Sequence, residues 1–199
     1  MRIVWVIRHA EREDNINPRW QQNKNPRGLK SDNSPLSLRG QKQADELCVR
    51  FAKQQLDHVF ASPFDRTVET ATRLIGNRQI PIKVEPGLAE ALYLCEKPPG
   101  FHDVTALKKL YPLVDLSYEP VFPAPLPKEG YGDDSRIDCT RAHGSPIGAI
   151  HEVMAGEWNY VGQATVSKFV EDPSKPNKFK LEYTSDASHL ADKSNLRPY

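Results

Sequence analysis

A histidine between two arginines follows the first apolar segment of the chain. Residues 3–7 read Ile-Val-Trp-Val-Ile, and Arg8 and His9 come directly after them, with Arg12 three positions further on. An imidazole nitrogen can act as a covalent nucleophile, and guanidinium groups bind phosphate oxygens through paired hydrogen bonds. The cluster therefore predicts a phosphoryl-transfer site. The alternative is a strand-end histidine in a solvated loop with ordinary surface charges.

A second candidate element carries Arg66. The sequence Ser-Pro-Phe-Asp-Arg at 62–66 follows a short apolar segment, and its proline is typical of the first turn of a helix. Helix N-termini attract anions through their free N–H groups and the helix dipole. Arg66 is therefore a candidate partner for Arg8 and Arg12. The alternative is a surface arginine that pairs with Asp65 or Glu69.

Two glutamates follow a third apolar segment and are candidate proton donors. Glu85 and Glu90 flank the sequence Pro-Gly-Leu-Ala. A carboxylic acid at this place can protonate a leaving alkoxide. We interpret Glu85 as a solvated glutamate at a helix start. Glu90 is the better candidate for the acid, because apolar residues surround it on both sides in the sequence.

A further histidine, His143, opens the sequence His-Gly-Ser-Pro ahead of an expected helix. It can donate an N–H to a phosphoryl oxygen or share in proton transfer, or it can be an ordinary loop residue. Zinc is the competing interpretation of the histidines. The His-Glu-x-x-His pattern is absent, and His143 and His151 are eight positions apart, which does not place them on one helix face.

The elements that must position these residues alternate in type. Apolar, β-branched segments at 3–7, 59–61 and 80–84 predict strands. Between them, apolar residues at helical spacing predict a helix capped by Ser37 and a helix from Pro63 to Gly76. This β-α-β-α-β order favours an α/β fold whose sheet is mostly parallel, with helices on both faces. Three strand ends then share one edge of the sheet, where ligands of such folds bind.

The remainder of the chain predicts fewer elements. Helices are expected at 103–111 and 147–155, and alternating residues at 165–170 and 178–183 predict a C-terminal antiparallel hairpin. The polar segment at about 13–35 and the proline-rich segment at about 95–136 are interpreted as loops that line the entrance to the site. We expect residues 1–199 to form a single domain.

The composition excludes several classes of protein. The formal net charge is +1, which argues against a nucleic-acid-binding protein. Three scattered cysteines without a Cys-x-x-Cys pair predict neither a disulfide framework nor a metal knuckle. The first apolar run is too short for a signal peptide or a membrane span, so we expect a cytoplasmic protein without membrane contact. The hydrophobic fraction of 38% predicts a thin core.

Taken in order, these motifs resemble the histidine phosphatase superfamily, also called phosphoglycerate mutase-like. The segments Arg-His-Ala-Glu-Arg-Glu-Asp at 8–14, Glu-Pro-Gly-Leu-Ala-Glu at 85–90 and Ser-Asp-Ala-Ser-His-Leu at 185–190 look most like its UBASH3/Sts and ecdysteroid-phosphate phosphatase branch. Ser-Pro-Phe-Asp-Arg and His-Gly-Ser-Pro fit the same pattern. The resemblance spans nearly the whole chain.

The resemblance implies a phosphatase that hydrolyses a phosphate monoester through a phosphohistidine on His9. Arg8, Arg12 and Arg66 would bind the phosphoryl oxygens, His143 would be a further donor, and Glu90 would be the general acid. No metal or other cofactor is expected, because arginines and imidazoles supply the positive charge. The substrate would be a phosphorylated small molecule or a phosphoprotein. A phosphoglycerate-type mutase and an inactive, phosphate-binding isoform are the alternatives.

The chain departs from the family pattern in two places. Ala10 stands where the family commonly has glycine, and we expect the small side chain to be tolerated. The second departure precedes His143, where the family has a helix and an apolar strand and this chain has only Ile-Asp-Cys-Thr-Arg-Ala at 137–142. We expect the loss of a helix and a strand to impair turnover, since a missing strand leaves the backbone groups of its neighbours unpaired.

Overall fold

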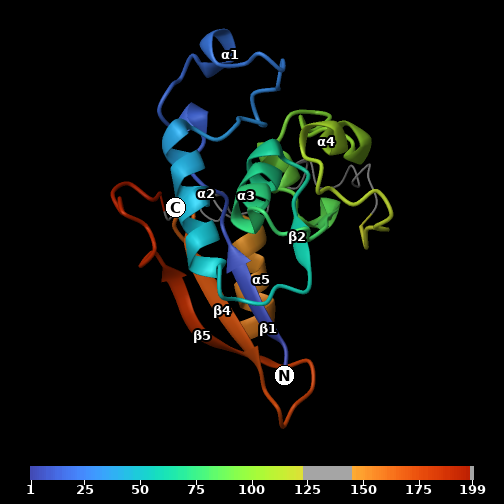
Figure 1. The fold of residues 1–199 in the computed structure, drawn as a ribbon, viewed down its shortest axis with the longest axis vertical. Coiled ribbons are helices and arrows are strands. Elements are labelled where there is room, and N and C mark those ends of the chain that lie inside the picture. The colour runs from blue at the N-terminus through green and yellow to red at the C-terminus, as the bar shows by residue number, and fades with distance from the viewer. Residues whose placement is uncertain (123–144, 198–199) are drawn as a thin grey trace.

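The computed structural model describes residues 1–122 and 145–197 of the chain. Figure 1 shows the order of the elements along it. Five strands are described: β1 (Ile3–Ile7), β2 (Val59–Ala61), β3 (Ile82–Val84), β4 (Val166–Glu171) and β5 (Phe179–Asp186). The helices are α1 (Trp20–Asn23), α2 (Leu38–Phe51), α3 (Asp65–Ile75), α4 (Val104–Leu110) and α5 (Ser145–Ala155).

The described strands form two sheets rather than one. One sheet has the order β1-β4-β5 and is antiparallel throughout, and the other is the parallel pair β2-β3. The fold is α/β as predicted, but a mostly parallel sheet is not confirmed. The reason is that β1 takes its partner from the far end of the sequence, with Ile3 opposite Val170 and Ile7 opposite Val166. Apolar composition alone does not distinguish this partner from a parallel one.

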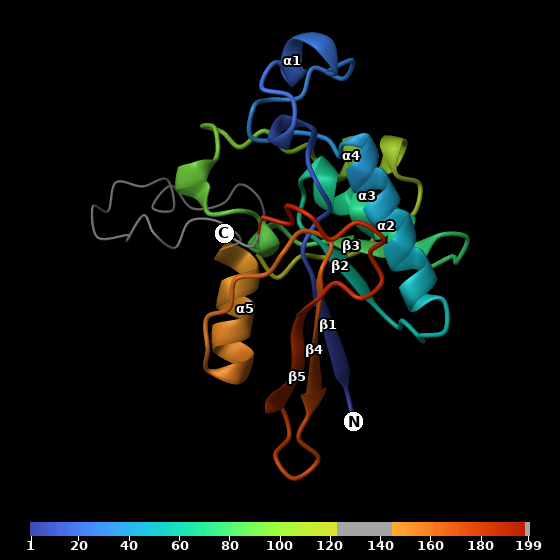
Figure 2. The ribbon, with the colours of Figure 1, turned by 90° about the vertical axis from the view of Figure 1, so that its left-hand side faces the viewer.

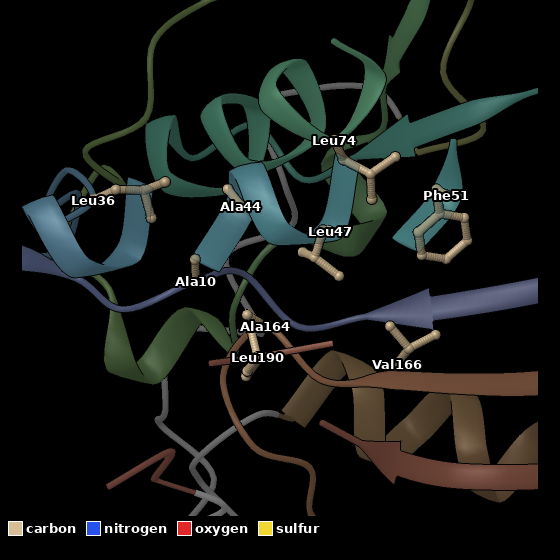
Figure 3. Close-up of a cluster of buried hydrophobic side chains, with 9 residues drawn as sticks. All are labelled: Ala10, Leu36, Ala44, Leu47, Phe51, Leu74, Ala164, Val166 and Leu190. Atoms are coloured by element: carbon tan, nitrogen blue, oxygen red, sulfur yellow. The ribbon is translucent and has the colours of Figure 1, made fainter. Parts of the chain in front are cut away.

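Helices cover both faces of the β1-β4-β5 sheet, as the sequence predicts. On one side, Leu47 and Phe51 of α2 pack with Val166 of β4 in a buried apolar cluster (Figure 3). On the other side, His151 of α5 meets Phe169 of β4 edge to face, with ring centroids 5.0 Å apart. Figure 2 shows α5 and the α2–α3 pair on opposite sides of the sheet.

The predicted helix ends and the hairpin are confirmed. Ser37 caps α2 by accepting a hydrogen bond from the Gly40 N–H, and Gly76 ends α3 with a φ of 62°. Asp103 caps α4 through two backbone N–H groups. The hairpin of β4 and β5 has half-buried side chains alternating with exposed ones along β5.

The segment at 13–35 contains more structure than the loop predicted from its polarity. A 3₁₀ turn covers Glu13–Asn15, and α1 follows it. Trp20 and Leu29 are buried, so two apolar side chains anchor an otherwise polar segment. Of the second expected loop, the structure describes residues 95–122, which contain α4. The rest of it, and the helix and strand expected to be missing before His143, lie outside the described residues.

Candidate active site

The loop after β1 is held in place by contacts with two helices. The Ala10 N–H donates to Thr70 Oγ1 of α3 at 3.2 Å, and the buried Ala10 side chain lies in the cluster of Figure 3. Glu11 is buried and accepts hydrogen bonds from Ser37 Oγ and Arg39 Nη1, both at 2.7 Å. These bonds fix the loop directly after His9, so the imidazole projects from a rigid support.

His9 is held as a neutral imidazole with a defined tautomer. Its Nδ1 lies 2.8 Å from the Ala10 carbonyl oxygen, which can only accept a hydrogen bond, so Nδ1 carries the proton. The pKa of His9 lies well below its ordinary value, first because of burial and then because of Arg66, Arg8 and Arg12. The lone pair therefore resides on Nε2, which is the atom available for attack on an electrophile.

Arg66 lies in the first turn of α3 and is buried. Its Nη1 donates to the Asp32 carbonyl oxygen at 2.9 Å, and its guanidinium lies 4.2 Å from the Phe64 ring centroid. Burial, and then repulsion from Arg12, lowers the pKa of Arg66 to about 10. Its Nε is buried and has no hydrogen-bond partner among the described residues. A buried cation with an unused donor is a suitable partner for an anion.

A network of polar contacts fixes the start of α3. Asp65 is fully buried and accepts hydrogen bonds from Asn33 Nδ2 at 2.8 Å and Tyr111 Oη at 3.2 Å, together with an ion pair from Arg27. The Asp65 N–H in turn donates to Asn33 Oδ1 at 3.0 Å. The alternative of an Asp65–Arg66 surface pair is therefore wrong, because Asp65 is committed to a separate buried network. Nothing in the local sequence around Asp65 indicates Asn33 or Arg27 as its partner.

The other two arginines have protein partners already. Arg8 is buried and donates from Nη1 to the carbonyl oxygens of Val161, at 2.7 Å, and of Arg197. Burial lowers the pKa of Arg8 to about 10. Arg12 forms a two-pronged pair with Asp14, with N–O distances of 2.9 and 2.8 Å. Arg12 therefore acts on His9 and Arg66 through its positive charge, which lowers their pKa values, while its guanidinium stays paired with Asp14.

Glu90 and Glu85 have different surroundings. Glu90 is half-buried, and its charge acts on both Arg8 and Arg66. Glu85 caps the 3₁₀ turn Pro86–Leu88 and accepts from the Gly87 and Val121 N–H groups and from Tyr118 Oη. The prediction that Glu85 starts a helix is confirmed, but it is buried rather than solvated. Its hydrogen-bond capacity is used by the protein itself.

A cavity of about 580 Å³ brings four of the candidate residues together. Arg8, His9, Arg66 and Glu90 all contribute to its wall, whereas Arg12 does not. Most of the remaining wall is apolar and comes from β1, β2, α3 and α5. Of the two segments expected to line the entrance, only the second contributes, through Tyr118, Val121 and Phe122. His143 lies outside the described residues.

Arg197 is a neighbour of the site that the sequence does not reveal. Its charge acts on Arg8, and its Nη2 donates to the Asn15 carbonyl oxygen at 2.8 Å. It lies almost two hundred positions away, in a polar C-terminal segment without periodicity. Thr70, which fixes the Ala10 backbone, is likewise concealed in an ordinary helix pattern.

Residues 1–122 and 145–197 contain no group of three or more His, Cys, Asp or Glu side chains that could hold a metal ion. Metal-independent chemistry stays a prediction. Within the same ranges no helix is long and apolar enough to cross a membrane.

The first half of the chain resembles a known protein family. Residues 4–98 match the histidine phosphatase superfamily (branch 1). The resemblance predicted from the sequence is thereby confirmed. The matched range includes Arg8, His9, Arg12, Arg66 and Glu90. It lies entirely within the described residues 1–122.

Two curated phosphatases resemble parts of the chain. An ecdysteroid-phosphate phosphatase of Drosophila melanogaster is 31% identical over 157 residues, which are 62% of this chain and 20% of that protein. An adenosylcobalamin/alpha-ribazole phosphatase of Escherichia coli is 32% identical over 92 residues, which are 45% of this chain and 40% of that protein. The chain thus spans less than half the length of either relative.

Two solved phosphatases share the fold. The ecdysone phosphate phosphatase of Bombix mori, solved in complex with tungstate, has a TM-score of 0.63 at 22% identity and covers 92% of each chain. The alpha-ribazole phosphatase of Shigella flexneri has a TM-score of 0.58 at 17% identity, covering 93% of this chain and 96% of the other. At these identities the likeness concerns the fold alone.

Proposed function

We propose that the chain is a phosphatase of this superfamily that hydrolyses a phosphate monoester through a phosphohistidine on His9. The observation that carries the proposal is the imidazole itself. Its Nδ1 is committed to the Ala10 carbonyl at 2.8 Å, so its Nε2 lone pair is free, and it shares one cavity with Arg8, Arg66 and Glu90. A neutral imidazole beside buried guanidinium groups suits nucleophilic attack on a bound phosphate dianion.

The first half of the reaction forms the intermediate. The Nε2 lone pair of His9 attacks phosphorus, and the bond between phosphorus and the ester oxygen breaks. Arg66, which contributes to the cavity wall, binds a phosphoryl oxygen through its guanidinium, and Arg8 and Arg12 add positive potential. Glu90 gives its proton to the departing alkoxide. We assign His143 the role of a further donor, and Pro146, three positions later, lies on the cavity wall.

The second half restores the enzyme. The Glu90 carboxylate accepts a proton from a water molecule while the oxygen of that water attacks phosphorus. The P–N bond breaks, inorganic phosphate leaves, and His9 returns to its neutral state. Each proton that leaves Glu90 in the first half returns to it in the second. No metal ion or other cofactor takes part in this scheme.

The relatives support a phosphorylated substrate and do not identify it. The curated relatives' names refer to ecdysteroid phosphate and to alpha-ribazole phosphate, both phosphorylated small molecules. We propose a phosphorylated small molecule or a phosphoprotein as the substrate class, and a single catalytic domain over residues 1–199 in the cytoplasm. An acceptor alcohol in place of water would make the same site a mutase.

A second candidate function is phosphate binding without turnover. It is favoured by the division of the sheet, because His9 follows β1 and Arg66 follows β2, and these two strands belong to different sheets. Their relative position then depends on the Ala10–Thr70 hydrogen bond and on side-chain packing. Binding tolerates a displacement of the two groups better than in-line attack does.

The test is hydrolysis of p-nitrophenyl phosphate by the 199-residue chain in the presence of EDTA. We expect turnover that EDTA leaves unchanged and that His9→Ala abolishes, while His58→Ala, a change at an exposed histidine, retains it. Loss of activity in EDTA with recovery on adding Mg²⁺ or Zn²⁺ would contradict the metal-free scheme. Tungstate binding without any turnover would favour the second candidate.

A further inference from the structure

Within residues 1–122 and 145–197, two strands that each have an edge without a strand partner border one cavity. In the described ranges, β1 is an outer strand of the antiparallel sheet, and β2 is paired only with β3. Val4–Ile7 of β1 and Val59–Ala61 of β2 both contribute to the cavity wall. The edge of a strand carries backbone N–H and C=O groups that pair readily with a further strand. The cavity is therefore bordered by two sets of such groups.

The other walls of this cavity are apolar on both sides of the strands. Ala71 and Leu74 of α3 contribute from one side, and Ile147 and Ile150 of α5 contribute from the other. Figure 2 shows these helices on opposite sides of β1. A strand that is covered by helices on both faces has apolar side chains pointing both ways. The cavity thus has the surroundings of an interior strand position.

The charge of the cavity differs between its ends. β1 runs towards Arg8 and β2 runs towards Arg66, so the carboxyl ends of both strands meet at these two residues, the arginine cluster. Arg66 keeps a buried Nε without a partner among the described residues. The starts of the two strands contribute apolar residues to the wall, Val4 in β1 and Val59 in β2. A strand lying parallel to β1 would end with its carboxyl group at the positive end.

We propose that this cavity is a docking slot for the carboxyl-terminal strand of another polypeptide. The occupant is an extended segment of about five apolar residues, matching the length of β1 at about 3.3 Å per residue, and it ends in a free α-carboxylate. It pairs with β1 on one side and β2 on the other. Its side chains contact α3 and α5, and its carboxylate binds Arg8 and Arg66. Strand addition and carboxylate capture are established modes of peptide recognition.

This proposal does not depend on turnover. It uses the arginine cluster as a carboxylate site, so inorganic phosphate or tungstate would compete with the peptide. A chain that binds such peptides and hydrolyses nothing would support the docking slot and contradict the phosphatase scheme. The reverse result would contradict the slot alone.

The experiment measures binding of labelled synthetic peptides to the full chain by fluorescence anisotropy. The probe is acetyl-Lys-Lys-Val-Ile-Val-Ile-Val with a free carboxyl end, in which the lysines maintain solubility. We expect saturable binding that tungstate reduces. A C-terminal amide should weaken it at least tenfold, because the pair with the arginines is lost. Proline at the central valine should abolish it, because proline removes a backbone donor and breaks strand pairing.

Two protein variants complete the test. Ala71→Phe adds a ring inside the slot and should weaken binding at least tenfold, whereas Val49→Phe adds the same ring on the outer side of α2 and should not. Equal binding of the proline peptide would show apolar adsorption instead of strand pairing and would overturn the proposal. Absence of binding by the carboxylate peptide would also overturn it. Should Ala71→Phe fail to fold, the peptide series on the unmodified chain decides.

Discussion

Gly40 of α2 lies directly against the backbone of Glu11, the second residue after His9. A Cβ atom at position 40 would overlap the Glu11 carbonyl oxygen and its neighbouring backbone atoms. The Ser37 N–H donates to that same oxygen at 3.0 Å. The glycine therefore permits the first turn of α2 to approach the loop that carries the nucleophile, although a glycine weakens a helix interior.

Gly40→Ala should accordingly destabilise the protein and reduce activity together. The added methyl group has backbone atoms on its path, so the loop or the helix must move, at a cost of about 1–3 kcal/mol. Thermal melting and p-nitrophenyl phosphate hydrolysis measure the two effects. Leu38→Ala, at an exposed position of the same helix, is the matched control and should change little. An alanine variant with the parent's melting temperature would show that the close approach is unimportant.

Arg66→Lys should weaken anion binding more than it weakens the fold. Lysine keeps the charge but loses the planar guanidinium that contributes to the cavity wall, and with it the stacking on Phe64. We expect KM for p-nitrophenyl phosphate and the inhibition constant for tungstate to rise at least tenfold. The control is Arg73→Lys, the same change in the same helix at an exposed pair with Asp45. Equal effects of the two substitutions on KM and on tungstate inhibition would contradict the role of Arg66 in anion binding.

Glu90→Gln tests proton donation to the leaving group. Glutamine keeps the size and cannot supply a proton, so substrates that need an acid should suffer most. We expect the turnover of p-nitrophenyl phosphate to change little, because its phenolate leaves readily. The turnover of an alkyl phosphate should fall by about 10² or more. Glu85→Gln is an unsuitable control because Glu85 accepts several hydrogen bonds. The exposed Glu119→Gln serves instead. Uniform losses across leaving groups would contradict the role of Glu90 as an acid.

Stability should fall as the pH falls below about 6.5, the ordinary histidine value. Burial lowers the pKa of His151. Burial is also the largest cause of the lowered pKa values of His9 and His189. The unfolded chain then binds protons that the folded protein does not, so stability rises with pH through the interval between the two values. This is the sign expected for bases that are buried in the neutral form.

His151→Leu should flatten this dependence. Both ring nitrogens of His151 are buried without a hydrogen-bond partner among the described residues, so leucine removes unsatisfied polar atoms as well as a titrating group. We expect the melting temperature to differ less between about pH 7.5 and about pH 5.5 than in the parent chain. His58→Leu, at an exposed histidine, should leave the difference unchanged. If the melting temperature of His151→Leu changes with pH as much as that of the parent chain, His151 is not the source of the acid sensitivity.

The sequence predicts local elements of this fold better than it predicts their partners. The helix cap at Ser37, the helix end at Gly76 and the C-terminal hairpin follow from side-chain chemistry within a few residues. The pairing of β1 with β4 does not, because an apolar strand is compatible with neighbours in either direction. The polarity of residues 13–35 likewise conceals the buried Trp20.

The candidate site shows the same division. Arg8, His9, Arg66 and Glu90 share a cavity because each follows a strand that ends in the same region, which the order of motifs predicts. What fixes them comes from distant positions, such as Thr70 for the Ala10 backbone and Arg197 beside Arg8. These partners are set by tertiary packing, and no local pattern indicates them.

The most direct test of the account is the trapping of phosphate on His9. The chain is mixed with p-nitrophenyl phosphate, quenched in alkali, where phosphohistidine survives, and digested for mass spectrometry. The account predicts a phosphorylated peptide containing His9, with the phosphate on Nε2, that appears during turnover and is absent from His9→Ala. Turnover without phosphate on His9, or phosphate retained in the His9→Ala variant, would contradict it.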